Sequence, residues 1–260
     1  MTGPLESPSV VVGAPRLEWR AATLTRVVTE TASTKTLVLD VPGWPGHQAG
    51  QHVDVRLTAE DGYQAQRSYS IASAPDDTRL AITVERLDDG EVSPYLVSEL
   101  RIGDQLELRG PIGGYFVWDP AMGGPLFLVA GGSGIVPLAA MLRTRAMASA
   151  IVRATVAATL LYSSRSWESI IYRDELMHLA EDPGVRVVHT LTRSRPAGWT
   201  GPARRIDRAM LVEVAPPPAQ RPQIYVCGPT ALVESVAELL VGLGHDPLRV
   251  RTERFGPTGG

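Results

Sequence analysis

One stretch, Arg67-Ser68-Tyr69-Ser70-Ile71-Ala72-Ser73, combines a fixed cation, an aromatic ring and hydroxyl groups. It lies where the pattern predicts a β-strand. Alternation along a strand places Arg67 and Tyr69 on one face and Ser68 and Ser70 on the other. Arginine pairs phosphate oxygens in a bidentate manner, and tyrosine offers a ring to pack against. These residues therefore fit a flavin site, although an ordinary strand is the stronger explanation when the stretch is taken alone.

A second candidate site follows at Gly90-Glu91-Val92-Ser93. Glycine lets the backbone approach a phosphate closely, and the start of a helix presents free N–H groups. Ser93 is predicted as the N-cap of a short helix, with Pro94 at its first position. A phosphate site and a plain capped turn explain this segment equally well.

A glycine-rich segment, Gly131-Gly132-Ser133-Gly134-Ile135-Val136-Pro137, follows a predicted buried strand over residues 125–130 and opens a predicted helix. Strand, glycine loop and helix in this order are typical of a dinucleotide phosphate site. Pro137 stands where the standard fingerprint has its third glycine. We favour phosphate binding over a bare tight turn.

The segment Cys227-Gly228-Pro229 ends another predicted strand, over residues 223–226. Ligands of open parallel sheets bind outside the carboxyl ends of the strands, so Cys227 is expected to face that crevice. A buried small residue is the alternative explanation for a lone cysteine. No histidine lies within ten residues of it, which argues against thiol catalysis.

The elements that must position these residues fall into two groups. The first half has short strand patterns separated by turn residues, which indicates a small antiparallel barrel. One short helix, expected over residues 95–100, interrupts it. The strands are expected at 22–29, 36–41, 52–57, 67–72, 80–86 and 105–109.

Beyond a predicted linker at residues 120–125, strand and helix patterns alternate, which indicates a doubly wound parallel sheet covered on both faces. Strands are expected at 125–130, 155–162, 185–191, 223–226 and 248–251, and helices at 135–148, 172–181, 207–214 and 230–243. The expected domains are a tail (1–14), a flavin-binding barrel (15–119), a nucleotide-binding α/β domain (120–250) and a tail that returns to the flavin (251–260).

Composition narrows the class of protein. The 260 residues are 44% hydrophobic and carry a net charge of −3, which gives no case for nucleic acid or membrane binding. The single cysteine excludes a four-cysteine iron–sulfur cluster within this sequence, and the five scattered histidines predict no metal site. No signal-peptide pattern is present, so we expect a cytoplasmic protein.

Together these motifs resemble the ferredoxin–NADP reductase family. Its flavin motif is matched by Arg67, Tyr69 and Ser70, and its second phosphate motif by Gly90 and Ser93. The loop 131–137, with its proline, and the segment 227–229 match its nucleotide motifs, and the acidic and aromatic pair near its C-terminus is matched by Glu253 and Phe255. The segment 110–118 is similar to the reductase components of bacterial oxygenase systems.

The helix start at residues 90–93 suits a pyrophosphate, which only FAD has, so FAD is favoured and FMN stays open. The resemblance implies NAD(P)H as the electron donor and the following site residues. Catalytic roles are expected for Ser70, Cys227 and Glu253. For Glu253, an ordinary surface carboxylate is an equally good explanation. Flavin contacts are expected from Arg67, Ser68, Tyr69, Ser70, Thr83, Val84, Glu85, Gly90, Val92, Ser93 and Phe255. Nucleotide contacts are expected from Gly132, Ser133, Gly134, Ile135, Ser163, Arg165, Arg173, Cys227, Gly228 and Pro229.

The choice of nucleotide depends on the end of the second parallel strand. Ser163 and Arg165, with help from Arg173, suit a 2′-phosphate and place NADPH slightly ahead of NADH, while Glu168 favours the free 2′-hydroxyl. Electrons are expected to leave to a separate iron–sulfur protein or oxygenase. A reductase of free flavin or small acceptors and a non-catalytic nucleotide-binding subunit remain alternatives.

Overall fold

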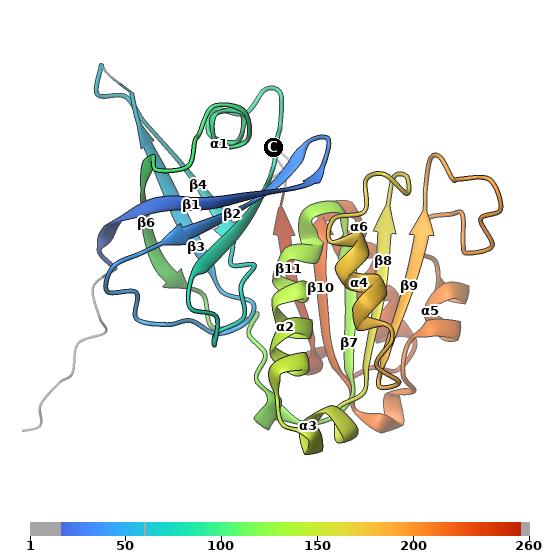
Figure 1. The fold of residues 1–260 in the computed structure, drawn as a ribbon. Coiled ribbons are helices and arrows are strands. Elements are labelled where there is room, and N and C mark those ends of the chain that lie inside the picture. The colour runs from blue at the N-terminus through green and yellow to red at the C-terminus, as the bar shows by residue number, and fades with distance from the viewer. Residues whose placement is uncertain (1–16, 60, 256–260) are drawn as a thin grey trace, which may run out of the picture.

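The computed structural model describes residues 17–59 and 61–255. Two β-sheets dominate the fold and lie next to each other (Figure 1). The tail expected over residues 1–14 and the end of the chain after Phe255 lie outside the described residues. No helix in the described part of the chain is long and apolar enough to cross a membrane.

The first half forms a six-stranded antiparallel sheet in the order β4-β3-β6-β1-β2-β5. A bridge between Ile71 and Ile82 joins the two edge strands, so the sheet closes into the expected barrel. Closure leaves one enclosed apolar core, to which every strand contributes inward-facing residues. The strands are β1 (Trp19–Thr31), β2 (Thr34–Asp40), β3 (His52–Thr58), β4 (Gln64–Ser70), β5 (Leu80–Glu85) and β6 (Gln105–Ile112).

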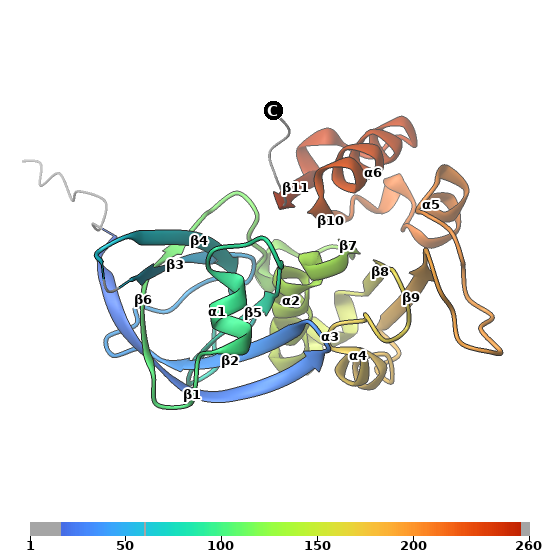
Figure 2. The same ribbon diagram turned by 90° about the horizontal axis from the view of Figure 1, so that it is seen from above.

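The helix α1 (Ser93–Ser98) covers one opening of this barrel (Figure 2). Its Leu96 and Val97 are buried in the barrel core. The helix therefore holds the preceding turn, with Gly90, close to the end of β4.

The second half is a parallel sheet in the order β11-β10-β7-β8-β9, with α2 and α4 on one face and α5 and α6 on the other (Figure 2). Both faces are covered, which explains why β7 is buried along its whole length. Its elements are β7 (Leu126–Gly131), α2 (Ile135–Met147), α3 (Ala150–Thr155), β8 (Ala158–Ser164), α4 (Arg173–Leu179), β9 (Val185–Leu191), α5 (Arg208–Val214), β10 (Gln223–Pro229), α6 (Thr230–Gly242) and β11 (Val250–Phe255). Short 3-10 helices are η1 (Pro120–Met122), η2 (Gly132–Gly134), η3 (Pro218–Gln220) and η4 (Pro247–Arg249).

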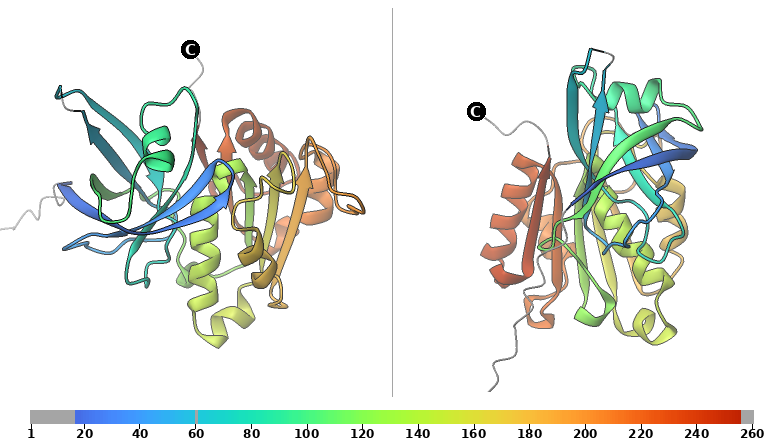
Figure 3. Two further views of the ribbon diagram at one scale, coloured as in Figure 1. Left: turned by 45° about the horizontal axis from the view of Figure 1, so that its top comes forward. Right: turned by 90° about the vertical axis from the view of Figure 1, so that its left-hand side faces the viewer.

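The strand order reverses between β7 and β10, because β8 and β9 lie to one side of this pair and β11 to the other. The crevice at the carboxyl ends of the two strands is the place where open α/β sheets bind ligands. The barrel stands beside this edge (Figure 3).

Apolar contacts hold the two halves together. Phe116 and Trp118, at the end of the barrel sequence, belong to the same buried cluster as the α2 face of the parallel sheet. The Tyr225 hydroxyl of β10 donates a hydrogen bond of 2.6 Å to the carbonyl of Val117. These contacts hold the end of the barrel sequence against α2 and β10.

Three expectations about elements need correction. The segment before β8 is a helix, α3, capped by the Ser149 side chain, although Ile151 and Val152 weaken the helical pattern. The strand expected from residue 155 begins only at Ala158. The last strand runs from Val250 to Phe255, so residues 251–255, expected as a tail, form the edge of the sheet beside β10.

Candidate active site

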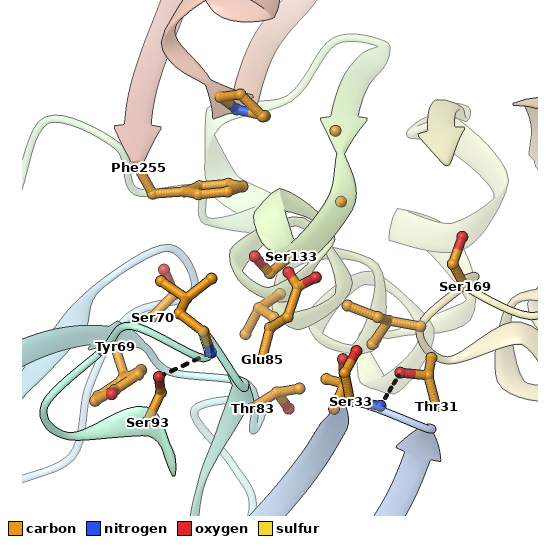
Figure 4. A pocket seen from close by; sticks show the side chains of 18 of the residues that line it. Thr31, Ser33, Tyr69, Ser70, Thr83, Glu85, Ser93, Ser133, Ser169 and Phe255 are labelled. Atoms are coloured by element: carbon orange, nitrogen blue, oxygen red, sulfur yellow. Dashed lines mark hydrogen bonds between the residues drawn. The ribbon is translucent and has the colours of Figure 1, made fainter. Parts of the chain in front are cut away.

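A cavity of about 700 Å³ lies between the barrel and the parallel sheet, lined by residues from both. Figure 4 shows the Phe255 ring reaching into it from the end of β11, on the side opposite Tyr69 and Ser93. The predicted site residues that line it are Arg67, Ser68, Tyr69, Ser70, Thr83, Glu85, Gly90, Val92, Ser93, Gly132, Ser133, Ser163, Arg165, Pro229 and Phe255.

The strand β4 presents the first motif to this cavity. Tyr69 packs against the barrel core, and burial raises the pKa of its hydroxyl to about 12, so it stays protonated at neutral pH. On the other face, the Ser68 hydroxyl donates a 2.6 Å hydrogen bond to Asp54 of β3. The Arg67 guanidinium is held 2.7 Å from the Glu91 carboxylate at the cavity wall. The motif thus offers a ring and a cation.

The turn before α1 differs from the prediction in one respect. The N-cap is Val92, and Ser93 is the first helical residue. The Ser93 hydroxyl instead accepts a 3.0 Å hydrogen bond from the backbone N–H of Leu87, which closes the turn around Gly90. A Cβ on Gly90 would lie 2.9 Å from that hydroxyl, so glycine is needed for this packing.

Two glycines of the turn between β7 and α2, Gly132 and Gly134, have different roles. Gly132 has φ of +55° and would place a Cβ in open space, so its backbone can face a ligand. Gly134 would place a Cβ only 2.2 Å from the carbonyl oxygen of Cys227, so it serves close packing of the turn on β10. Ile135 is fully buried. The expected phosphate-binding role is therefore best filled by Gly132 and Ser133.

Cys227 and Glu253 lie just behind the cavity wall, two residues before Pro229 and Phe255 on adjacent parallel strands. Cys227 is buried, and burial raises the pKa of its thiol well above the usual value, so it is not a thiolate. Burial also raises the pKa of Glu253 to about 7, and its Oε2 has no hydrogen-bond partner among the residues that the structure describes. Glu253 is therefore a partly buried carboxyl group, with 28% of its side chain exposed.

His52 of β3, which no motif includes, lies near Glu253 outside the cavity lining. It lies opposite Ser70 in the β3–β4 register, and its Nδ1 is 4.0 Å from Glu253 Oε1. Desolvation lowers its pKa, so the neutral imidazole is favoured. The pairing links the barrel to β11 beside the cavity.

Several predicted residues do not line the cavity. Val84 is buried in the barrel core, while Gly228 packs against Gly131. The guanidinium of Arg173 lies over the Trp167 ring at 5.6 Å and pairs with Asp174. The predicted residues outside the lining are Val84, Gly134, Ile135, Arg173, Cys227, Gly228 and Glu253.

Other residues that line the cavity were not among the predicted contacts. Thr31, Ser33 and Thr34, at the tip of the β1–β2 hairpin, reach the cavity only because the barrel curls (Figure 4). Thr192 follows β9 and donates to the carbonyl of Ser164, so the same strand-end rule that located Ser163 would have found it. The remaining ones are Leu87, Glu91, Gly131, Val136, Ser164, Ser169, Ile171 and Leu232.

The residues present fit a flavin and a nicotinamide nucleotide. On the barrel side, Arg67 supplies the cation that a pyrophosphate needs, and Tyr69 supplies an apolar ring edge. On the sheet side, the open backbone of Gly132 lies at the start of a helix, where anions bind. The two sets line one cavity, which allows two ligands to meet.

Comparisons with known proteins agree with this geometry. Residues 21–117 match the oxidoreductase FAD-binding domain, and residues 128–238 match the oxidoreductase NAD-binding domain. Ferredoxin–NADP reductase B of Sorangium cellulosum is 37% identical over 217 residues, which cover 80% of this chain and 85% of that protein. The flavohem-like FAD/NAD binding domain of Vibrio cholerae nitric oxide dioxygenase superposes with a TM-score of 0.80 at 26% identity, over 92% of this chain and 99% of that one.

The glycine betaine monooxygenase reductase subunit of Pseudomonas aeruginosa is 34% identical over 238 residues, 90% of this chain. The match spans 63% of that relative's own length. The chain belongs to the ferredoxin–NADP reductase family and combines an FAD-binding barrel with an NAD-binding α/β domain.

Proposed function

We propose that the chain is a reductase that takes electrons from NAD(P)H onto bound FAD and passes them singly to a separate redox partner. The observation that carries this proposal is the single cavity lined by both Arg67 and Gly132, one from each nucleotide motif. FAD, when bound, supplies the chemistry, because it accepts a hydride and releases electrons one at a time. The protein supplies binding, alignment and control of protons.

The roles of the residues follow from their positions. Arg67 would bind the flavin pyrophosphate, which requires it to turn from Glu91 or to bind both groups. The Ser70 hydroxyl would face the reacting edge of the ring, and Gly132 and Ser133 would hold the nucleotide pyrophosphate. Phe255 occupies part of the space between the two halves and would move when the nicotinamide enters.

Glu253 and Cys227 would lie behind the cavity wall on the nucleotide side. The raised pKa of Glu253, about 7, keeps a transferable proton on its carboxyl group near neutral pH. The buried thiol of Cys227 stays protonated, because burial raises its pKa, and so adds no charge behind this part of the wall.

NADPH is the proposed donor. Ser163, Arg165 and Thr192 line the cavity where the β8 and β9 ends meet, and the backbone N–H of Arg193 donates a 2.9 Å hydrogen bond to the Arg165 carbonyl. Of these lining residues, Arg165 carries the cation that an additional phosphate on the nucleotide would pair with. Arg173 does not line the cavity and pairs with Asp174, so we propose Arg165 ahead of it for this role.

The proposed acceptor is a separate iron–sulfur protein or an oxygenase component, and the proposed location is the cytoplasm. Relatives are a ferredoxin–NADP reductase and the reductase subunit of a monooxygenase. Within these 260 residues one cysteine cannot hold a four-cysteine cluster, so electrons must leave to a partner or to another domain.

The test is the visible spectrum of the purified protein with added FAD, followed by anaerobic addition of NADPH. We expect stoichiometric bound flavin that NADPH bleaches and that ferricyanide reoxidises. Flavin that binds only weakly and leaves after reduction would favour the free-flavin reductase. An absence of flavin binding would contradict the proposal and favour the alternative of a non-catalytic nucleotide-binding subunit.

A further inference from the structure

We propose that Tyr172 is a positioning residue that sets the distance between the nucleotide half and the flavin half of the cavity. The proposal rests on the proposed function, since it concerns how the two ligands are aligned. Tyr172 itself does not line the cavity.

The backbone of Tyr172 is in an unusual conformation. Its φ and ψ are 59° and 27°, in the left-handed region that residues with a side chain rarely adopt. Such a conformation persists only where the surroundings hold it, and it is concentrated at functional sites. Tyr172 caps the start of α4 without a side-chain hydrogen bond to the helix, so capping does not explain the choice of residue.

The side chain of Tyr172 crosses from the α/β domain into the barrel. Its hydroxyl forms a short, buried hydrogen bond with the Thr83 hydroxyl of β5. Thr83 is 2.8 Å from the Thr36 hydroxyl of β2, which in turn donates to Glu30 of β1 at 2.6 Å. One tyrosine hydroxyl is thereby tied to three strands of the barrel.

The ring of Tyr172 is held from the other side by Arg143 of α2. The guanidinium carbon lies 4.5 Å from the ring centroid, and the same guanidinium binds the Glu175 carboxylate at 2.6 and 2.7 Å. It also donates to the carbonyl of Ala72, just beyond β4 in the barrel. Arg143 and Tyr172 therefore form a clamp (Arg143, Tyr172, Ala72 and Thr83) that joins the domains.

The clamp lies directly behind the cavity wall. Thr83, the partner of the hydroxyl, lines the barrel side, and Ile171, the chain neighbour of Tyr172, lines the sheet side. A shift of this joint would change the gap between the two halves of the cavity. Hydride transfer needs reacting atoms about 3–3.5 Å apart, and a misplacement of about 1 Å costs up to about 100-fold in rate.

The first test is Tyr172→Phe in the holoenzyme, which keeps the ring and removes the hydroxyl. We expect a rate constant for flavin reduction about tenfold lower in stopped-flow measurements, with the dissociation constants of FAD and NADPH within about twofold of wild type. The charge-transfer absorbance between nicotinamide and flavin should weaken in parallel. The matched control is Tyr115→Phe, which removes an exposed hydroxyl that contacts the Val250 carbonyl across the same domain junction at 3.4 Å.

Thr83→Ser and Thr83→Val complete a double-mutant cycle. The Thr83→Ser variant keeps the hydroxyl and should retain most of the wild-type rate of flavin reduction. The valine variant should add little to the loss already caused by Tyr172→Phe if both act through the same bond.

A second readout needs neither ligand nor activity. Amide hydrogen exchange at Ile171 and Thr83 should be faster in Tyr172→Phe than in wild type and unchanged in Tyr115→Phe. Unchanged exchange, or an unchanged reduction rate in the loaded enzyme, would overturn the proposal. If wild type binds no flavin, the proposed function fails, yet the exchange experiment still decides whether Tyr172 holds the two domains.

Discussion

Cys227 and Glu253 lie opposite each other on the parallel strands β10 and β11. Burial raises the pKa of both side chains, so neither carries a full charge at neutral pH. An uncharged pair beside the cavity suits a site that must admit a flat, apolar ring. It also makes the stability of the protein depend on pH.

The first prediction concerns Glu253 and pH. Its folded-state pKa of about 7 is above the usual value of 4.5, so the folded protein binds more protons than the unfolded chain between these values. Stability from this group is therefore full below about pH 4.5 and is lost as the pH rises through 7. The loss amounts to about 3 kcal/mol, at about 1.4 kcal/mol per pKa unit.

Glu253→Gln removes this titration. We would measure urea unfolding at pH 5 and pH 8. The free energy of unfolding of Glu253→Gln, relative to that of wild type, should be higher at pH 8 than at pH 5. The control is Glu213→Gln, at an exposed site. An equal difference between wild type and Glu253→Gln at both pH values would refute the assigned burial.

The second prediction concerns Gly134. An alanine here would place its Cβ 2.2 Å from the Cys227 carbonyl oxygen, so the turn and β10 must separate. We expect a loss of about 1–3 kcal/mol in the free energy of unfolding, together with weaker NADPH binding. Gly114→Ala, where a Cβ meets nothing within 4 Å and φ is not positive, should be nearly neutral. Equal stability of the two variants would contradict the packing role.

The third prediction concerns Arg67. Replacing it by alanine removes the charged partner of the flavin pyrophosphate, and a hydrogen bond to a charged group contributes about 1.5–3 kcal/mol. The dissociation constant of FAD should rise about 10- to 100-fold, as measured by flavin fluorescence during titration of the cofactor-free protein. Arg101→Ala, an exposed arginine of the same domain that does not line the cavity, serves as the control. An FAD affinity that is unaltered in Arg67→Ala would show that Arg67 does not bind the pyrophosphate.

The fourth prediction concerns the choice of nucleotide. Arg165→Ala should lower kcat/KM for NADPH about tenfold and leave the value for NADH nearly unchanged, because only the former carries the 2′-phosphate. Arg173→Ala should leave the preference intact, since Arg173 lies outside the cavity. A preference unchanged by Arg165→Ala would refute the assignment of this residue.

Much of the fold was predictable because periodicity is a local property. The strands of the barrel and the alternating strands and helices of the second half follow from runs of apolar residues and from turn residues between them. β9, expected at 185–191, has those limits. The helix α3 was missed because β-branched residues hid its pattern, and Ser93 was misassigned because its hydroxyl ties the turn at Leu87 instead of capping α1.

The sequence alone determined which residue types the site offers: the cation of Arg67, the ring of Tyr69 and the open turn at Gly132. The tertiary structure decided which of them share a cavity, because that depends on strand order and barrel closure. Thr31 and Ser33 line the cavity from the tip of a hairpin, whereas Arg173, which was predicted to bind the nucleotide, does not line it. The burial that raises the pKa of Glu253 and the contact of Tyr172 with Thr83 also come from residues far apart in the chain, and no local pattern encodes such long-range contacts.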